Sequence, residues 1–185
     1  MRPLALTACL AACLLLAACA QEPPERRSYR NDAVGLRFHP AKGWTVAETT
    51  EDGCTFAVEA SNGPDLRFVI CLSPPRTDIL LTQNAFVSCE NVKQYVAESL
   101  KGIKPTCMRG GAGDHFGYDT LYARLLRGGD GKVRVQFVNH VFAPVKGRLL
   151  QVMAYAVADD DKQAHALFDA NRAALFAMMQ SVRLR

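Results

Sequence analysis

The stretch Gly110-Gly111-Ala112-Gly113-Asp114-His115 is where residue types and spacing come nearest to a reactive site. Its glycines predict a flexible loop that ends in a carboxylate and an imidazole, and Asp119 follows close behind. Asp and His side chains can bind divalent metals, so these residues form a candidate metal or hydrolytic site. The stretch lacks the Lys-Ser/Thr pair of a phosphate-binding loop and follows no helix start. Such side chains on a turn are more often simply solvated, so we expect no metal here.

His140 is the second residue that could do chemistry, as a possible companion of Asp114 and His115 in an envelope enzyme. It falls on the mixed face of a predicted strand, where a hydrogen-bonded core imidazole is the more common situation. The sequence has no Gly-x-Ser-x-Gly nucleophile elbow. We therefore assign no catalytic residue, cofactor or metal, and expect a protein that is not an enzyme.

The first twenty residues have the layout of a secretory signal, with Arg2 followed by an uncharged stretch rich in Leu and Ala. A spanning helix is the alternative, but the stretch is of minimal length and Ala has little preference for hydrocarbon. Its end, Leu16-Ala17-Ala18-Cys19, resembles the lipobox of bacterial lipoproteins. The same letters at Leu10-Ala11-Ala12-Cys13 would leave too short an apolar region. Residues 1–18 are therefore predicted to be a signal peptide, cleaved before Cys19.

The lipobox resemblance implies a triacylated N-terminus on Cys19, and several acyl chains anchor a protein stably. Ala20 follows in place of an inner-membrane Asp, which in lipoproteins of this kind favours the outer membrane, facing the periplasm. Residues 19–28 have no apolar period and form a lipidated tether that reaches roughly 30 Å when extended. We expect a cell-envelope protein whose first partner is the membrane.

Residues 29–185 remain, enough for one domain with a sizeable core. Removal of the signal peptide takes away only Arg2, so 21 of the 22 basic side chains stay, against 18 acidic ones. This mild balance, with basic residues scattered along the chain, argues against a nucleic-acid partner.

Alternation of apolar residues predicts strands at 36–39 and 44–49 around a turn, and a hairpin of 54–60 with 66–72 around Asn62-Gly63-Pro64. Further antiparallel strands are expected near 115–126, 132–143 and 148–157, with a shorter one at 106–109. From Phe137 onward apolar residues load both faces, so one end of the sheet should be covered on both sides. No secondary structure is predicted for residues 77–87.

Two helices should provide this cover. Ser88 is a candidate N-cap for a helix of about three turns that stops at Gly102. Asp159, Asp160 and Asp161 supply caps and favourable charge for a second helix. Its apolar stripe includes Phe168 and Met178, which we expect to be core.

Four cysteines lie in the body, and in an exported protein an even number favours two disulfides. Zinc would want closely paired ligands such as a C-x-x-C, which is absent. Cys89 and Cys107 both lie roughly 16 to 20 Å from the turn at Gly102, so they could meet. The pairing of Cys54 with Cys71 remains open. The best apolar match of the hairpin places the two cysteines on different faces of the sheet, whereas a two-residue loop would place them directly across from each other in the hairpin.

The segment from Tyr29 through Gly35-Leu36-Arg37-Phe38-His39-Pro40 to Gly43-Trp44 is similar to the start of PsbP-like domains. The close is similar too, with a long strand at Gly147 to Ala156, an acidic break and a helix that ends near Val182. The resemblance implies an α+β fold in which an antiparallel sheet packs between helices, an α/β/α sandwich over residues 29–185. Its members are mostly binding or assembly factors, and it carries over no catalytic motif.

Three hypotheses follow. The first is a membrane-anchored envelope lipoprotein with a non-enzymatic role, which binds a protein or an envelope component. The second is a metal-binding or hydrolytic enzyme that uses the Asp114 and His115 loop. The third is a small-ligand carrier with a pocket between the sheet and the last helix.

Overall fold

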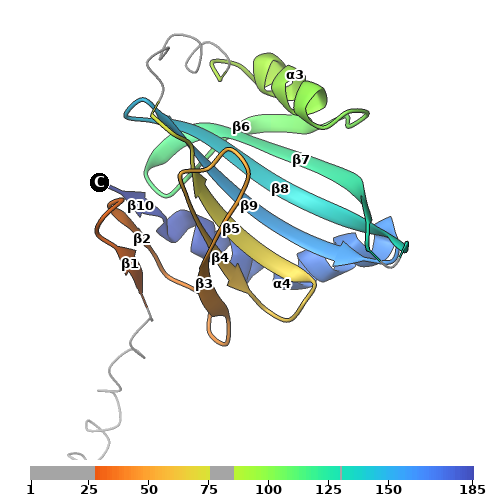
Figure 1. Ribbon diagram of the computed structural model, residues 1–185. Coiled ribbons are helices and arrows are strands. Elements are labelled where there is room, and N and C mark those ends of the chain that lie inside the picture. Colours follow the sequence, from red (N-terminus) through yellow and green to blue (C-terminus); the bar gives the residue numbers. More distant parts are fainter. Residues whose placement is uncertain (1–27, 76–85, 130) are drawn as a thin grey trace, which may run out of the picture.

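The computed structural model describes residues 28–75, 86–129 and 131–185, so the predicted signal peptide and nearly all of the tether lie outside the described residues. An antiparallel sheet lies between two helices, α3 on one face and α4 on the other (Figure 1). The α+β class predicted from the sequence is confirmed. No helix in the described ranges is long and apolar enough to cross a bilayer.

The large sheet has seven strands in the order β3-β4-β5-β9-β8-β7-β6. Their bounds are β3 Thr45–Thr49, β4 Phe56–Ser61, β5 Leu66–Leu72, β6 Thr106–Ala112, β7 His115–Arg127, β8 Val133–Val145 and β9 Arg148–Ala158. All neighbouring pairs are antiparallel. The strands expected from alternation are therefore present, each within a few residues of its predicted bounds.

A second sheet of three short strands has the order β1-β2-β10, with bounds Tyr29–Asn31, Leu36–Phe38 and Arg183–Leu184. The sequence suggested that β2 and β3 flank one turn, but the structure places them in different sheets. β2 pairs instead with β1 and with the last residues of the chain. Strands of two or three residues give too short an alternation to be recognised in a sequence.

Both helices begin where the polar caps predict. The Ser88 side chain accepts a hydrogen bond from the Asn91 amide at the start of α3 (Cys89–Ser99). The Asp160 carboxylate accepts one from the Gln163 amide at the start of α4 (Asp161–Ser181). Each cap satisfies an amide that the first helical turn leaves without a partner.

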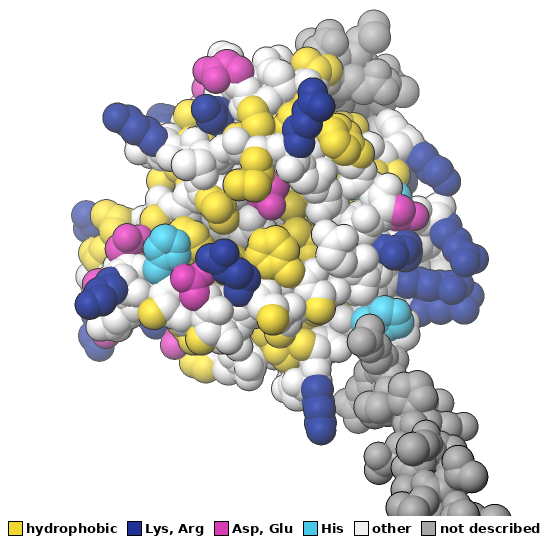
Figure 2. All heavy atoms as spheres, turned by 180° about the vertical axis from the view of Figure 1, so that it is seen from behind, with side chains coloured by type: hydrophobic (Ala, Val, Ile, Leu, Met, Phe, Trp, Pro, Cys, Tyr) yellow, Lys and Arg dark blue, Asp and Glu magenta, His cyan; other side chains and the backbone are white. Residues whose placement is uncertain are grey.

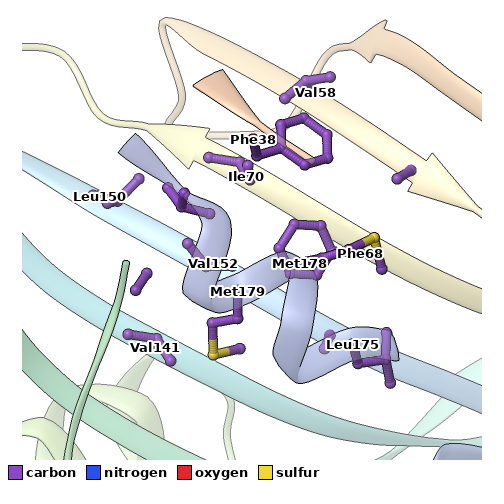
Figure 3. Close-up of a cluster of buried hydrophobic side chains, with 14 of the residues drawn as sticks. Phe38, Val58, Phe68, Ile70, Val141, Leu150, Val152, Leu175, Met178 and Met179 are labelled. Atoms are coloured by element: carbon purple, nitrogen blue, oxygen red, sulfur yellow. The ribbon is translucent and has the colours of Figure 1, made fainter. Parts of the chain in front are cut away.

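The main core lies between α4 and the sheet (Figure 3). Phe168, Leu175 and Met178 from the helix are at most 1% exposed and pack over Phe68 and Val152. Burial of each such side chain contributes about 1.5 to 3 kcal/mol. The prediction that Phe168 and Met178 are core is confirmed.

A smaller core lies between α3 and the opposite face of the sheet. Val92 and Val96 of α3 pack there with Tyr118, Tyr122 and Phe142. From Gln136 to Ala143 every residue of β8 is buried, which confirms that this part of the sheet is covered on both sides.

Both disulfides are present, Cys89–Cys107 between α3 and β6 and Cys54–Cys71 between the β3–β4 loop and β5. The hairpin keeps the apolar register, with Val58 opposite Ile70. The predicted conflict for Cys54 disappears because β4 begins only at Phe56, so the alternation of faces does not extend back to Cys54. Closing a loop of 17 or 18 residues stabilises a fold by about 3 kcal/mol.

Candidate functional site

The glycine-rich stretch before His115 is not the flexible loop that the sequence predicts. β6 continues to Ala112, so only Gly113 and Asp114 connect it to β7. The Gly113 amide donates to the Met179 carbonyl at 2.9 Å, and a Cβ on Gly113 would lie 1.7 Å from the Val182 carbonyl oxygen. The glycine is there to let the turn dock against the end of α4.

His115 also contacts the last residues of the chain. Its Nε2 accepts a hydrogen bond from the Leu184 amide at 3.1 Å and lies 3.3 Å from an Asp114 carboxylate oxygen. The imidazole is therefore committed to holding β10 against the sheet, and it is not displayed to a substrate. Only the adjacent Asp114 carboxylate is exposed.

Asp119 does not join this turn. It pairs with Met108, four residues along β7 from His115 and thus about 13 Å away. Its carboxylate accepts a hydrogen bond from Asn139 at 2.5 Å, and burial raises the pKa of Asp119 to about 6. Within the described part of the chain, no three His, Cys, Asp or Glu side chains are placed to hold a metal ion.

His140 lies on the other face of the sheet from His115. It belongs to the face of β8 that α3 partly covers, whereas His115 and Ala112 belong to the α4 side. The structure therefore separates His140 from Asp114 and His115, the other two residues of the hypothetical enzyme site.

A cavity of about 510 Å³ lies on the α3 side of the sheet, and we call it the α3 cavity. Its floor is formed by β7, β8 and β9, including Tyr122, Val138 and Met153. One wall is the last turn of α3 and the other is the β3–β4 loop. The sequence placed a pocket beside the last helix, which is wrong, because α4 fills its own face of the sheet with core side chains.

The two disulfides fix these two walls. Cys89–Cys107 ties the start of α3 to β6, and Cys54–Cys71 ties the β3–β4 loop to β5. The second bond itself lines the cavity, where Gln151 donates a weak hydrogen bond to the Cys71 sulfur. Neither the end of α3 nor the β3–β4 loop is hydrogen-bonded into the sheet as a strand, so the disulfides hold both walls in place.

His140 is the buried polar group of the cavity, with 7% of its surface exposed. Its Nδ1 lies 3.1 Å from the Tyr122 hydroxyl, and its ring packs on Phe142 at 3.9 Å between centroids. Nε2 has no hydrogen-bond partner among the described residues. The prediction of a buried core imidazole is confirmed, and its hydrogen-bond partner at Nδ1 is Tyr122.

The protonation state of His140 follows from these contacts. Burial lowers the pKa of His140 to about 3, although a side-chain hydrogen bond with Gln151 partly opposes this, so the ring is neutral. Burial raises the pKa of Tyr122 to about 12, so its hydroxyl keeps its proton. A phenol is a stronger acid than an imidazole N–H and should donate to Nδ1. The ring proton then sits on Nε2, which is a buried donor.

Charged groups stand farther along the same cavity. The Arg124 Nε donates to the Gln136 side-chain oxygen at 2.5 Å. Glu51, on the loop wall, is half-buried, and desolvation followed by the charges of Glu59 and Asp52 raises the pKa of Glu51. No feature of the sequence indicated this group, because its members come from the β3–β4 loop and two strands.

The docking of the Gly113 turn gives a direct stability test. Gly113→Ala should destabilise the protein by at least about 2 kcal/mol, because the new Cβ meets the Val182 carbonyl and the backbone has φ +61°. Gly129→Ala, with nothing near its Cβ, should change stability by less than about 0.5 kcal/mol. Urea unfolding measures both, and equal stabilities would contradict the docking.

The protonation of His140 can be read by nitrogen NMR of the imidazole ring. At pH 6 the ring should be neutral with its proton on Nε2, and it should titrate only near pH 3. Tyr122→Phe, which removes the donor to Nδ1, should abolish the preference for that tautomer. Titration of the wild-type ring near pH 6.5, or a proton on Nδ1, would show that the assignment is wrong.

Several solved structures are similar to this chain at low identity, and three of them are described here. The cyanobacterial PsbP protein of Synechocystis is 13% identical with a TM-score of 0.47, and the match covers 86% of this chain and 92% of that chain. Protein PA94 of Pseudomonas aeruginosa is 15% identical with a TM-score of 0.49, and the match covers 86% of this chain and 96% of that chain. LpqN of Mycobacterium tuberculosis, which is described as involved in cell envelope biogenesis, is 14% identical with a TM-score of 0.46, and the match covers 80% of this chain and 82% of that chain. No family model and no curated protein matches the sequence. Likenesses of this size assign neither a ligand nor an activity. One of these structures is a PsbP protein, and the first and last segments of this sequence resemble PsbP-like domains.

Proposed function

We propose that this chain is a lipid-anchored, non-enzymatic binding protein of the cell envelope, and that the α3 cavity is its binding site. The observation that carries the proposal is the α3 cavity itself, whose lining combines apolar side chains with the buried polar residues Tyr122, Gln136 and His140. A cavity of this size is typical of small-molecule sites, which favours an envelope component over a protein partner.

The geometry offers little to a chemical mechanism. The four cysteines of residues 29–185 form two disulfides, and the His115 imidazole accepts a hydrogen bond from the Leu184 amide. With a pKa of about 3, His140 would be a weak general base near neutral pH. Within the described residues, no carboxylate is hydrogen-bonded to the His140 ring to orient or activate it.

The proposed anchor fits one end of the folded body. β1 begins at Tyr29, directly after the predicted tether, and belongs to the small sheet. Arg30, Arg37 and Arg183 stand side by side across its three strands, and we call them the arginine row. Lys and Arg side chains gather along one edge of the molecule (Figure 2). Arg30 is ion-paired with Asp32, and the row still carries net positive charge, which a nearby anionic lipid surface would attract.

The anchor is tested by Cys19→Ser in cells. The variant should lose lipidation, stay unprocessed at this site and leave the outer-membrane fraction, because serine has no thiol to carry the lipid. Cys13→Ser, at the alternative lipobox, is the matched control and should fractionate as the wild type does. A Cys19→Ser protein of full processed size in the membrane fraction would overturn the anchor.

The binding site is tested by Met153→Trp, which places a larger side chain on the cavity floor. Native mass spectrometry of protein purified from its own membranes should show a bound small molecule on the wild type and none on the variant. Met108→Trp, at an exposed position on β6, should retain it. Thermal unfolding confirms that each variant is folded, and a wild type without any bound molecule would contradict the proposal.

A further inference from the structure

The small sheet lies at one end of the folded body, and the described chain begins at that end with Ser28. β10 follows α4 directly, and α4 runs about 31 Å from its start at Asp161. The start of α4 and the β7–β8 turn lie together at the opposite end, because the last residue of β9, Ala158, pairs with Val135 near the start of β8. Figure 1 shows the same separation. The predicted tether, residues 19–28, therefore joins the body at the end that carries the arginine row.

The arginine row occupies the outer face of the small sheet. Arg30, Arg37 and Arg183 lie opposite one another in the register of its strands. Leu36 and Phe38, on either side of Arg37, are buried in the main core, so the alternation of β2 directs Arg37 away from that core. Arg30 and Arg183 share this face and are exposed. Neighbouring strands lie about 4.8 Å apart, so the row spans about 10 Å.

Acidic groups compensate only part of the charge of the row. Asp32 is ion-paired with Arg30, and this hydrogen bond, together with the charges of Arg37 and Arg185, lowers the pKa of Asp32. Arg183 donates to two backbone carbonyls at the end of α4, and these carry no charge. Within the described ranges, neither Arg37 nor Arg183 forms an ion pair. Three guanidinium groups and one carboxylate leave the row with two positive charges.

Other carboxylates at this end of the molecule are engaged elsewhere. Glu48 accepts hydrogen bonds from the first and last side chains of β1, which alternate with Arg30 and so lie on the opposite face of the small sheet. Asp114, on the turn beside Arg183, lies 3.3 Å from the His115 ring. The outer face of the small sheet is therefore basic.

A lipid surface is the partner that this arrangement fits. Guanidinium groups bind phosphate oxygens through two parallel hydrogen bonds. A row of such groups on one sheet face suits a surface that carries many phosphates better than a single small anion. The predicted tether reaches roughly 30 Å at most, so an acyl anchor on Cys19 would hold the row beside the lipid headgroups at a high effective concentration.

We infer that the outer face of the small sheet rests on an anionic lipid surface, with the arginine row bound to lipid phosphates. The inference rests on the proposed lipid anchor and adds an orientation to it. An acyl anchor alone leaves the body free to turn on its tether. The contact holds the small sheet against the membrane and directs the β7–β8 turn away from it.

The test uses the processed, lipidated chain in nanodiscs that contain a gadolinium-chelating lipid. The gadolinium broadens amide resonances near the headgroups, so the ratio of the broadening at Arg37 to that at Gly129, on the β7–β8 turn, reports the orientation. This ratio should be at least about threefold higher in discs with phosphatidylglycerol than in discs of phosphatidylcholine alone. Raising the ionic strength from about 0.1 to about 1 M should remove most of the difference, because the screening length falls from about 10 to about 3 Å.

Variants assign the contact to the arginine row. A triple variant with Arg30→Gln, Arg37→Gln and Arg183→Gln should lower the ratio in anionic discs to the value in phosphatidylcholine. The double variant Arg30→Gln with Arg37→Gln keeps the Arg183 bonds to α4 and should lose at least about half of the difference, since each arginine contributes separately.

A matched control removes the same charge from exposed positions elsewhere, at Lys101→Gln, Lys104→Gln and Arg127→Gln. This variant should keep the wild-type ratio. Thermal unfolding shows that each variant is folded.

The outcomes separate the contact from the anchor. Equal ratios in both kinds of disc, or a control variant that loses as much as the row variant, would overturn the contact and leave the basic face to an acidic protein. The intact mass of the same sample reports the acyl chains, and a mass without them would overturn the anchor. Flotation of that chain with phosphatidylglycerol vesicles but not with phosphatidylcholine vesicles would then still support the contact, and no flotation would overturn it as well.

Discussion

The two faces of the large sheet receive unequal cover, and the other features of the molecule follow from this. α4 has 21 residues and spans about 31 Å, whereas α3 has 11 residues and spans about 16 Å. α4 can therefore close its face with an apolar core. The shorter α3 covers only part of the other face, and the remainder keeps a cavity with polar side chains. Two disulfides hold the walls of that cavity, because neither wall is long enough to be fixed by packing alone.

The α3 cavity is consequently a polar interior with an incomplete hydrogen-bond network. Tyr122 satisfies one nitrogen of His140 and thereby fixes where the proton of the other nitrogen points. The residues that first suggested catalysis, Asp114 and His115, serve instead to join β10 and the end of α4 to the sheet. Reactive residue types therefore support the architecture here, while a buried polar residue marks the site.

Local patterns predicted most of the fold and little of the site. Alternation located the long strands, and Ser88 and Asp160 marked the helix starts, because strand faces and caps depend on neighbouring residues. The equal heights of Cys89 and Cys107 anticipated a pair that the structure joins. The close approach of Gly113 to Val182 depends on segments about 70 residues apart, so a loop was expected where a tight turn lies. The cavity was assigned to the wrong face because sequence periodicity does not show how far each helix extends over a sheet.

The central claim is that the α3 cavity, which His140 helps to line, binds a small molecule of the cell envelope. The most direct measurement follows the nitrogen resonance of His140 Nε2 in the processed chain while a small-molecule extract of the cell envelope is added. The account predicts that this resonance shifts when a ligand enters the cavity, whereas the ring resonances of His115, on the opposite face, do not move. A His140 resonance that stays unchanged across the titration would contradict it.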